Sequence, residues 1–224
     1  MSRKRYIVTL LIVLTSVTAI GQKRLSVPEM YVGVQGGVSA STVMFSPKVG
    51  NMSPIEQACV LGANAGFVFR YSGHKCCAVQ LELDYLHRGW REHNSTGTYT
   101  RDLHYLEIPL LMHIYFGSER WRGFFNLGPQ IGYCIKDGGG KGTQISSDGN
   151  EYAPINHRFD WGLATGLGFY YRSRNAGLYQ FEARFDYSFG AIFGTQLEDH
   201  FAMANPMDLS INLAWMWELK KKKK

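Results

Sequence analysis

The sequence predicts an all-β protein that folds as a closed, eight-stranded, antiparallel, up-and-down transmembrane β-barrel. Aromatic residues make up 14% of the chain, and Gly is abundant at 25 residues whereas Pro is scarce at 7, a balance that favours strands over helices. Eight segments alternate apolar and polar residues with the period of two that a strand requires. The connections between these segments are short and long in turn, as in outer-membrane barrels.

The N-terminus has the features of a secretory signal peptide. Basic residues 3–5 precede an apolar run over residues 6–17, and the small residues Ala19 and Gly21 then place a cleavage site before Gln22. The apolar run is too short for a comfortable transmembrane helix, which disfavours the alternative of a retained helical anchor. The expected organisation is a signal peptide over residues 1–21, a barrel domain over 22–219 and a polylysine tail over 220–224.

The predicted strands lie near residues 31–40, 60–71, 78–91, 103–116, 123–134, 160–171, 178–190 and 207–218. Strands of this length suit a tilted crossing of a bilayer, whereas strands of soluble proteins are on average about half as long. Alternation is clearest in the seventh segment, where Tyr179, Phe181 and Phe185 share one face and Glu182 and Arg184 share the other.

The connections predict which end of the barrel faces the periplasm. Those near residues 72–77, 117–122 and 173–177 are short and the others are longer. The longest is expected over residues 135–159, with the glycine-rich stretch 137–142 as a loop tip. Since periplasmic turns are short and the strand number is even, both termini are expected in the periplasm.

The apolar face of the strands is expected to contact lipid, although a soluble lipocalin-like barrel with this face inside is an alternative. The predicted strands contain no lysine, a residue that a water-exposed face normally carries. Small residues Gly162, Gly166 and Gly168 alternate with bulky ones, which suits the cramped interior of an eight-stranded barrel. Aromatic residues expected to form interfacial girdles are Tyr31, Phe69, Tyr71, Tyr115, Phe116, Phe169, Tyr170, Tyr171, Trp215 and Trp217.

Residues 104–116 read HYLEIPLLMHIYF, and this segment resembles the fourth strand of the small outer-membrane barrels of Bacteroidetes known as PorT-like proteins. The glycine-rich stretch 31–37, the stretch 181–187 and the aromatic last strand extend the resemblance over the mature chain. The resemblance implies an outer-membrane barrel and, for the namesake of the family, a part in type IX protein secretion. The lysine run after Leu219 departs from the terminal aromatic residue that is usual, and Trp217 is the nearest substitute.

Eight charged or titratable residues are expected to face the interior and to form a network there. One interpretation is a proton or ion path, or a gate, because ionisable groups within a membrane span often mark function. The favoured interpretation is a structural filling of paired charges, since buried polar groups must satisfy one another. The expected members are Glu82, Asp84, Arg88, Glu107, His113, Glu182, Arg184 and Asp186.

No enzymatic, cofactor or metal site is predicted. The histidines near the long connection between the third and fourth segments match no hydrolase or metal motif, nor do their neighbours. These residues are His87, His93, His104, Glu92, Ser95 and Asp102. Stretch 137–142 lacks the ending of a phosphate-binding loop. The net charge of +6 includes the signal peptide and the lysine tail, so no nucleic-acid partner is expected.

Four cysteines occur in a compartment that permits disulfides. They are Cys59, Cys76, Cys77 and Cys134. If a pair forms, Cys59 with Cys134 is favoured because both lie near the same end of the barrel, and free thiols are an equal alternative.

These observations together predict an integral outer-membrane protein with a lumen filled by side chains. It would act through its loops or periplasmic turns as a binding or accessory component, with membrane lipid and an envelope protein as partners. An open diffusion pore is disfavoured because it needs about sixteen strands. The alternatives are a component of type IX secretion and a soluble ligand-binding barrel.

Overall fold

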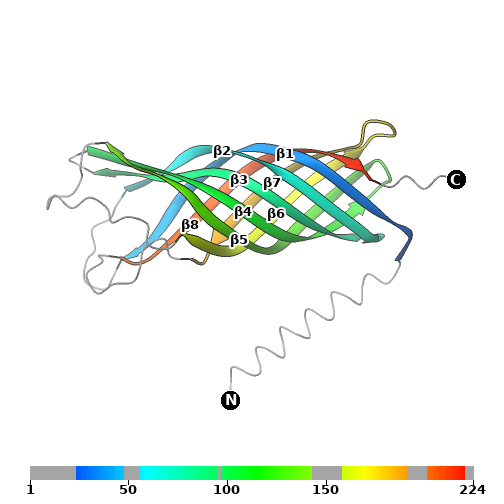
Figure 1. Ribbon diagram of the computed structural model, residues 1–224, viewed down its shortest axis with the longest axis horizontal. Helices are drawn as coiled ribbons and strands as arrows, with labels where there is room; N and C mark the ends of the chain where they lie inside the picture. Colours follow the sequence, from blue (N-terminus) through cyan, green and yellow to red (C-terminus); the bar gives the residue numbers. More distant parts are fainter. Residues whose placement is uncertain (1–23, 48–55, 95–96, 143–157, 191–200, 220–224) are drawn as a thin grey trace, which may run out of the picture.

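The structure, a computed structural model, is a single closed β-barrel and describes residues 24–47, 56–94, 97–142, 158–190 and 201–219. Each strand pairs antiparallel with its neighbours in sequence, and the first strand closes the barrel against the last (Figure 1). The predicted fold class is therefore confirmed. The strands are β1 (Arg24–Pro47), β2 (Glu56–His74), β3 (Cys77–Asn94), β4 (Gly97–Gly117), β5 (Trp121–Gly142), β6 (Phe159–Arg172), β7 (Leu178–Ser188) and β8 (Phe201–Glu218).

Several strands are longer than predicted: β1 extends seven residues further at each end, β5 eight residues further at its C-terminal end, and β4 and β8 begin six residues earlier. The ladder of β3 and β4 continues to the pair Asn94 and Gly97, where a long connection was expected. Stretch 137–142, expected as a loop tip, belongs to β5 and pairs with β4. These ends were missed because their sequence is polar at both alternating positions, so no hydrophobic pattern marks them as strand. The signal peptide and the lysine tail lie outside the described residues.

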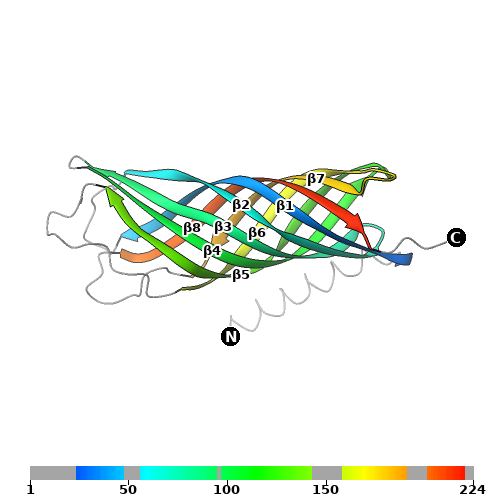
Figure 2. The ribbon, with the colours of Figure 1, turned by 45° about the horizontal axis from the view of Figure 1, so that its top comes forward.

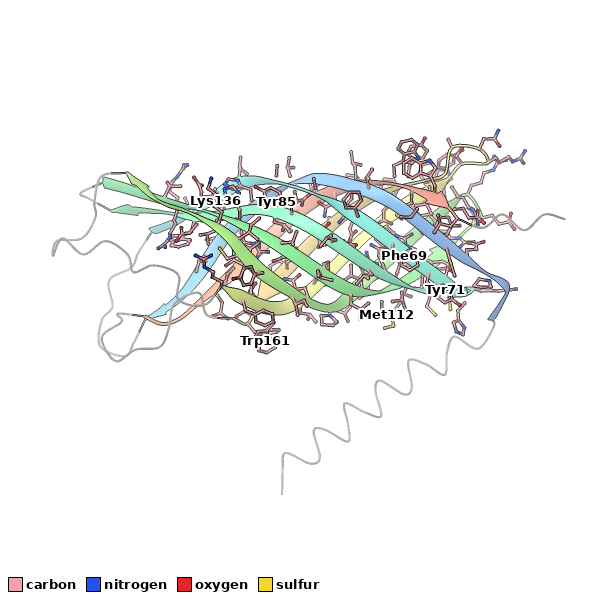
Figure 3. The ribbon with its side chains drawn as sticks, in the orientation of Figure 1. Phe69, Tyr71, Tyr85, Met112, Lys136 and Trp161 are labelled. Carbon is pink, nitrogen blue, oxygen red and sulfur yellow. The ribbon has the colours of Figure 1, made fainter. Side chains whose placement is uncertain are left out.

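The wall of the barrel is apolar outside and polar inside. Large apolar side chains are exposed on the outer face, for example Leu61 at 80%, Phe67 at 64% and Leu213 at 64%. Figure 3 shows Phe69, Met112 and Trp161 projecting from the wall. Buried positions of the same strands hold charged and amide side chains. This arrangement is the reverse of a soluble barrel with an apolar core, and it gives the surface that a bilayer requires.

Three of the aromatic residues expected at the outer wall face the interior instead. Tyr31, Tyr115 and Tyr170 are each only 4% exposed and belong to a cluster of buried apolar side chains. The strand period explains the correction, because these tyrosines fall on the same parity as the polar residues of their strands. Of the predicted aromatic residues, those exposed on the outer wall are Phe69, Tyr71, Phe116, Phe169, Trp215 and Trp217.

The described ends of the chain lie at the same end of the barrel. Arg24 of β1 and Glu218 of β8 are near the tight turns that follow β2, β4 and β6 (Figures 1 and 2). Gly117 and Gly177 have positive φ angles of 124° and 89° at two of these turns, a conformation that glycine adopts without steric cost. Within the described part of the chain, no helix has the length and hydropathy to cross a membrane.

Candidate functional site

The interior of the barrel contains two layers of buried ion pairs, and the first is built around Arg184 of β7. Its Nη1 and Nη2 donate to the two carboxylate oxygens of Glu82 at 2.6 and 2.9 Å. Its Nη2 and Nε donate to Glu182 at 3.0 and 3.2 Å. Because Glu82 lies on β3, this fork spans the lumen between non-neighbouring strands. Bidentate pairs between guanidinium and carboxylate are among the strongest hydrogen bonds in proteins.

Amide side chains surround the Arg184 layer and donate further hydrogen bonds to its carboxylates. Gln35 donates to Glu82 at 2.8 Å and to Asp84 at 2.6 Å. Asn126 donates to Glu182 at 2.8 Å and is itself bonded to His113, whose Nδ1 lies 2.6 Å from the amide oxygen. Such partners are what permit charges to remain buried.

The second layer is built around Arg88 of β3, which meets carboxylates from three other strands. Its guanidinium lies 2.6 Å from Glu107, 2.9 Å from Asp208 and 3.5 Å from Asp160. Arg88 also sits over the ring of Tyr105, at 4.8 Å from its centroid. One cation thus ties β3 to β4, β6 and β8 across the lumen.

A small polar cavity separates the two layers. Asp84, Glu107, Arg184 and Asp186 line it, and the space left is about 10 Å³, enough for one water molecule. Two further buried groups at this cavity, the Oε1 of Gln35 and the Nε2 of another amide, Gln130, have no hydrogen-bond partner within the described residues.

An apolar plug fills the lumen at the end where the chain ends lie. It consists of Tyr31, Val68, Ala78, Tyr115, Phe124, Tyr170, Leu178, Ala214 and Met216. Arg70 joins this plug to the Arg184 layer, because its guanidinium lies 5.6 Å from the ring centroid of Tyr170 and its Nε donates to Gln80 at 2.7 Å. At the rim, Arg172 bridges Glu29 at 3.1 Å and Glu218 at 3.0 Å.

All eight residues of the predicted interior network are buried, and the structure distributes them over different surroundings. Glu82, Asp84, Glu182 and Arg184 form the first layer, whereas Arg88 and Glu107 belong to the second. His113 packs among aromatic rings, 4.7 Å from that of Phe124, and Asp186 lines the cavity. The prediction treated as one network what the barrel builds as two layers.

The predicted network omits three charged residues of these layers. They are Arg70, Asp160 and Asp208. The strand period would have found them, since each occupies an inward position of its strand: Arg70 and Asp208 two residues from another buried polar residue, and Asp160 two residues before buried Gly162. Arg70 was overlooked in a segment rich in aromatic residues, and Asp160 lies at the very start of β6.

Glycines on the inner face leave the space that these side chains occupy. A Cβ atom added at Gly132 would lie 3.1 Å from Cγ of Glu107. One added at Gly166 would overlap the Oε1 of Glu182. The glycines that alternate along the strands are therefore part of the layered interior, because charged side chains from the neighbouring strand fill the volume they vacate.

The remaining residues considered from the sequence form no catalytic arrangement in the described structure. His87 and His104 lie on strands and face outward, with Nε2 of His87 3.5 Å from Asp102. Ser95 and the side chains of Glu92 and His93 lie outside the described residues. In the described part of the chain, no three His, Cys, Asp or Glu side chains are placed to hold a metal ion.

All four cysteines are free thiols. Cys134 is buried on β5 beside Tyr105, its partner on β4, whereas Cys59 is exposed on β2 and pairs with Trp90 of β3. The favoured pair of Cys59 with Cys134 is therefore not formed, because two other strands separate these residues and their side chains lie on opposite faces of the wall.

A family model described as outer membrane protein beta-barrel domain matches residues 22–194. The chain belongs to this family. Its barrel is thus an outer-membrane barrel by family as well as by the distribution of apolar and polar residues on its wall. No curated protein matches the sequence.

Solved structures of small outer-membrane barrels align with this chain over most of their length. The outer membrane protein OprG from Pseudomonas aeruginosa aligns with a TM-score of 0.55 and 14% identity, over 84% of this chain and 96% of that chain. Ail of Yersinia pestis, crystallised with the heparin analogue sucrose octasulfate, aligns with a TM-score of 0.43 and 14% identity, over 84% and 99%. Outer Membrane Protein W of E. coli aligns with a TM-score of 0.38 and 15% identity, over 84% and 96%.

Proposed function

We propose that the protein is a closed outer-membrane barrel that does not conduct solutes and acts through its surface as a binding or accessory component of the envelope. The observation that supports this proposal is the filled interior. Along the lumen, the apolar plug, the Arg184 layer and the Arg88 layer follow one another, and the cavity between the two layers has room for one water. With its interior occupied, the barrel presents only its wall, its loops and its turns to other molecules.

Conductance measurements test the closed lumen. The full mature chain is inserted into planar bilayers, and its folding is checked in parallel by the faster migration of unboiled protein on a denaturing gel. We expect no conductance steps from the wild-type protein. A variant with Arg70→Ser, Tyr170→Ser and Arg184→Ser shortens three side chains that span the lumen, and we expect small steps from it. Regular steps from the wild-type protein would contradict the proposal.

We place the proposed binding surface at the end of the barrel where the paired strands β3 and β4 extend beyond the apolar part of the wall. The pairs from Arg91 with Thr100 to Asn94 with Gly97 form the outermost part of this ladder. Removing residues 91–94 together with 97–100 shortens the hairpin without changing the register of the pairs that remain. We expect this variant to insert normally and to lose crosslinks to its envelope partner in living cells. Unchanged crosslinks would place the binding surface elsewhere.

The proposed orientation puts both termini and the three tight turns in the periplasm. It is supported by the location of the chain ends beside the short turns and by the usual asymmetry of outer-membrane barrels. Arg24 and Glu218, at the same end of the barrel, would then both face the periplasm.

A part in type IX secretion is a second candidate, favoured by the resemblance of residues 104–116 to the PorT-like proteins. The described residues of this segment supply Glu107 to the Arg88 layer, which is a structural role within the barrel. Deletion of the gene in its own host, followed by measurement of secreted cargo, tests the candidate: normal secretion would eliminate it.

A further inference from the structure

The outer wall of β3, β4 and β5 carries a row of basic side chains. This row borders the apolar surface on the side away from the chain ends. Tyr85, Leu106 and Tyr133 are cross-strand partners on these three strands, and all three are exposed. The next outward row of partners is His87, His104 and Lys136. We call these three residues the histidine–lysine row. The side chains change from apolar to basic between these two adjacent rows. This change places the histidine–lysine row at the membrane interface, since tyrosines concentrate at the level of the lipid headgroups.

A β-bulge in β5 turns Lys136 toward the outside. Between the pair His104 with Lys136 and the pair Tyr105 with Cys134, β5 contains one extra residue, Ile135. As a result both Ile135 and Lys136 are exposed, although regular alternation would place the lysine in the lumen. Bulges commonly re-aim a side chain in this way. Figure 3 shows Lys136 beside Tyr85 on the outer wall, whereas Tyr71 lies toward the other end.

Contacts within the row organise hydrogen-bond donors on a half-exposed surface. The rings of His87 and His104 lie 5.1 Å apart between centroids. The Tyr85 hydroxyl lies 2.7 Å from Nδ1 of His104, which leaves Nε2 as the ring atom available to an external group. Nε2 of His87 lies 3.5 Å from Asp102, so one carboxylate neighbours the two imidazoles and the Lys136 ammonium group.

We propose that the histidine–lysine row binds the phosphate of an outer-leaflet lipid headgroup. An anion is the complementary ligand for two imidazoles and an ammonium group on one surface. A lipid is the source of that anion because the row continues directly into the lipid-facing wall through Tyr85 and Tyr133. Arg91, exposed on the same face of β3, adds a further positive charge above the row. The histidine–lysine row itself is separate from the lumen and, apart from the neighbouring Arg91, from the hairpin tip assigned to partner binding.

Native mass spectrometry of the purified full chain in detergent tests the proposal. The probes are dioleoyl phosphatidic acid, whose headgroup is a bare phosphate, and dioleoylglycerol, which has the same acyl chains and no phosphate. We expect retained phosphatidic acid and no retained dioleoylglycerol. Lys136→Gln is expected to weaken binding of phosphatidic acid about fivefold, and the combined variant His87→Asn, His104→Asn, Lys136→Gln at least about tenfold. Lys75→Gln, at an exposed turn of the opposite end, is the matched control and is expected to bind as the wild type does.

Three outcomes would overturn the proposal. Equal retention of the two lipids would show that the acyl chains alone are recognised. Undiminished binding by the triple variant would place the phosphate elsewhere. Full competition by millimolar inorganic phosphate, with no advantage for the lipid, would make the ligand a free anion. Because the substituted side chains lie on the outer surface, the variants are expected to keep the gel migration of the folded barrel, which is measured on the same samples.

Discussion

At the scale of single residues, the barrel depends on burying charge together with its partners. Arg184 and Glu82 are 5% and 2% exposed, so neither side chain retains its hydration. The energy lost on burial is recovered only because the guanidinium makes four hydrogen bonds to two carboxylates. A residue in this layer therefore contributes to stability through its partners, and its removal leaves those partners buried without a counter-charge.

Arg184→Met is expected to lower the free energy of unfolding by about 3–5 kcal/mol, because Glu82 and Glu182 would remain buried without their cation. The measurement is urea unfolding of the protein in lipid vesicles. Arg120→Gln, at an exposed turn, is the matched control and is expected to change stability by less than about 0.5 kcal/mol. A combined variant, Arg184→Met with Glu82→Gln and Glu182→Gln, is expected to recover part of the loss. Equal stability of the single variant and the wild type would show that the layer is not needed for folding.

Gly166→Ala tests the space that the interior glycines provide. The added methyl group would overlap the Glu182 carboxylate, so we expect a loss of about 1–3 kcal/mol in the same unfolding experiment. Gly36→Ala is the control, since its Cβ would lie 3.6 Å from the backbone oxygen of Asn64, an ordinary contact. Similar stability changes for the two variants would argue against a specific role for the space at Gly166.

At the scale of the elements, sequence periodicity could predict the strands only where one face contacts lipid. There, as in β7, the alternation of apolar and polar residues gives the correct inward and outward faces. The alternation gives no signal beyond the apolar part of the wall. There the ends of β3, β4 and β5 have polar surroundings on both faces, so polar residues fit on either face. The bulge at Ile135 is also invisible to a period of two, so Lys136 was assigned to a loop and Asp137 was not paired with Arg101, which it contacts at 2.5 Å.

The sequence could predict which residues face the interior but not which of them contact one another. The strand period identifies Glu82 and Arg184 as inward residues, yet their contact joins positions 102 residues apart. That contact depends on the closure of the barrel and on the relative shift of all its strands, neither of which is encoded in any single segment. For the same reason the sequence could not separate the Arg88 layer from the Arg184 layer.

Deletion of Ile135 tests the bulge as a unit of the fold. Without it, Cys134 and Lys136 become neighbours on a regular strand and keep their inward and outward directions, so we expect the variant to fold and to migrate as a compact unboiled band. Ile131, similarly exposed on the same strand, is the control. Its deletion shifts every later residue of β5 to the opposite face, and we expect no compact band from that variant. Equal folding of both variants would contradict this account of the bulge.

At the scale of the whole molecule, the barrel has two unlike ends. One carries the apolar plug, tight turns and the chain ends, with Arg172 closing the rim against Glu29 and Glu218. The other carries extended strands and the histidine–lysine row. The filled lumen separates these ends. A structural effect of binding at one end could therefore be transmitted to the other end only through the strands of the wall.

An epitope tag placed in the turns and hairpins tests the orientation. A tag inserted between residues 95 and 96 is expected to be detected by antibody on intact cells. A tag inserted after Arg174, in the turn that follows β6, is expected to be detected only after the outer membrane is permeabilised. The heat-dependent gel shift of both proteins serves as the folding control. The reverse pattern would place both termini at the cell surface.

The bridge from Arg184 to Glu82 also bears on how such a chain enters a membrane. An open sheet of the early strands would present Glu82, Asp84 and Arg88 to hydrocarbon, where each unpaired charge costs several kcal/mol. Arg184, the partner of Glu82 and Asp84, arrives only with β7, and Asp208, one of the partners of Arg88, arrives only with β8. Insertion of one strand at a time is therefore unfavourable, because it would expose these charges to lipid. The growing sheet must keep its charged inner face away from lipid until β1 pairs with β8.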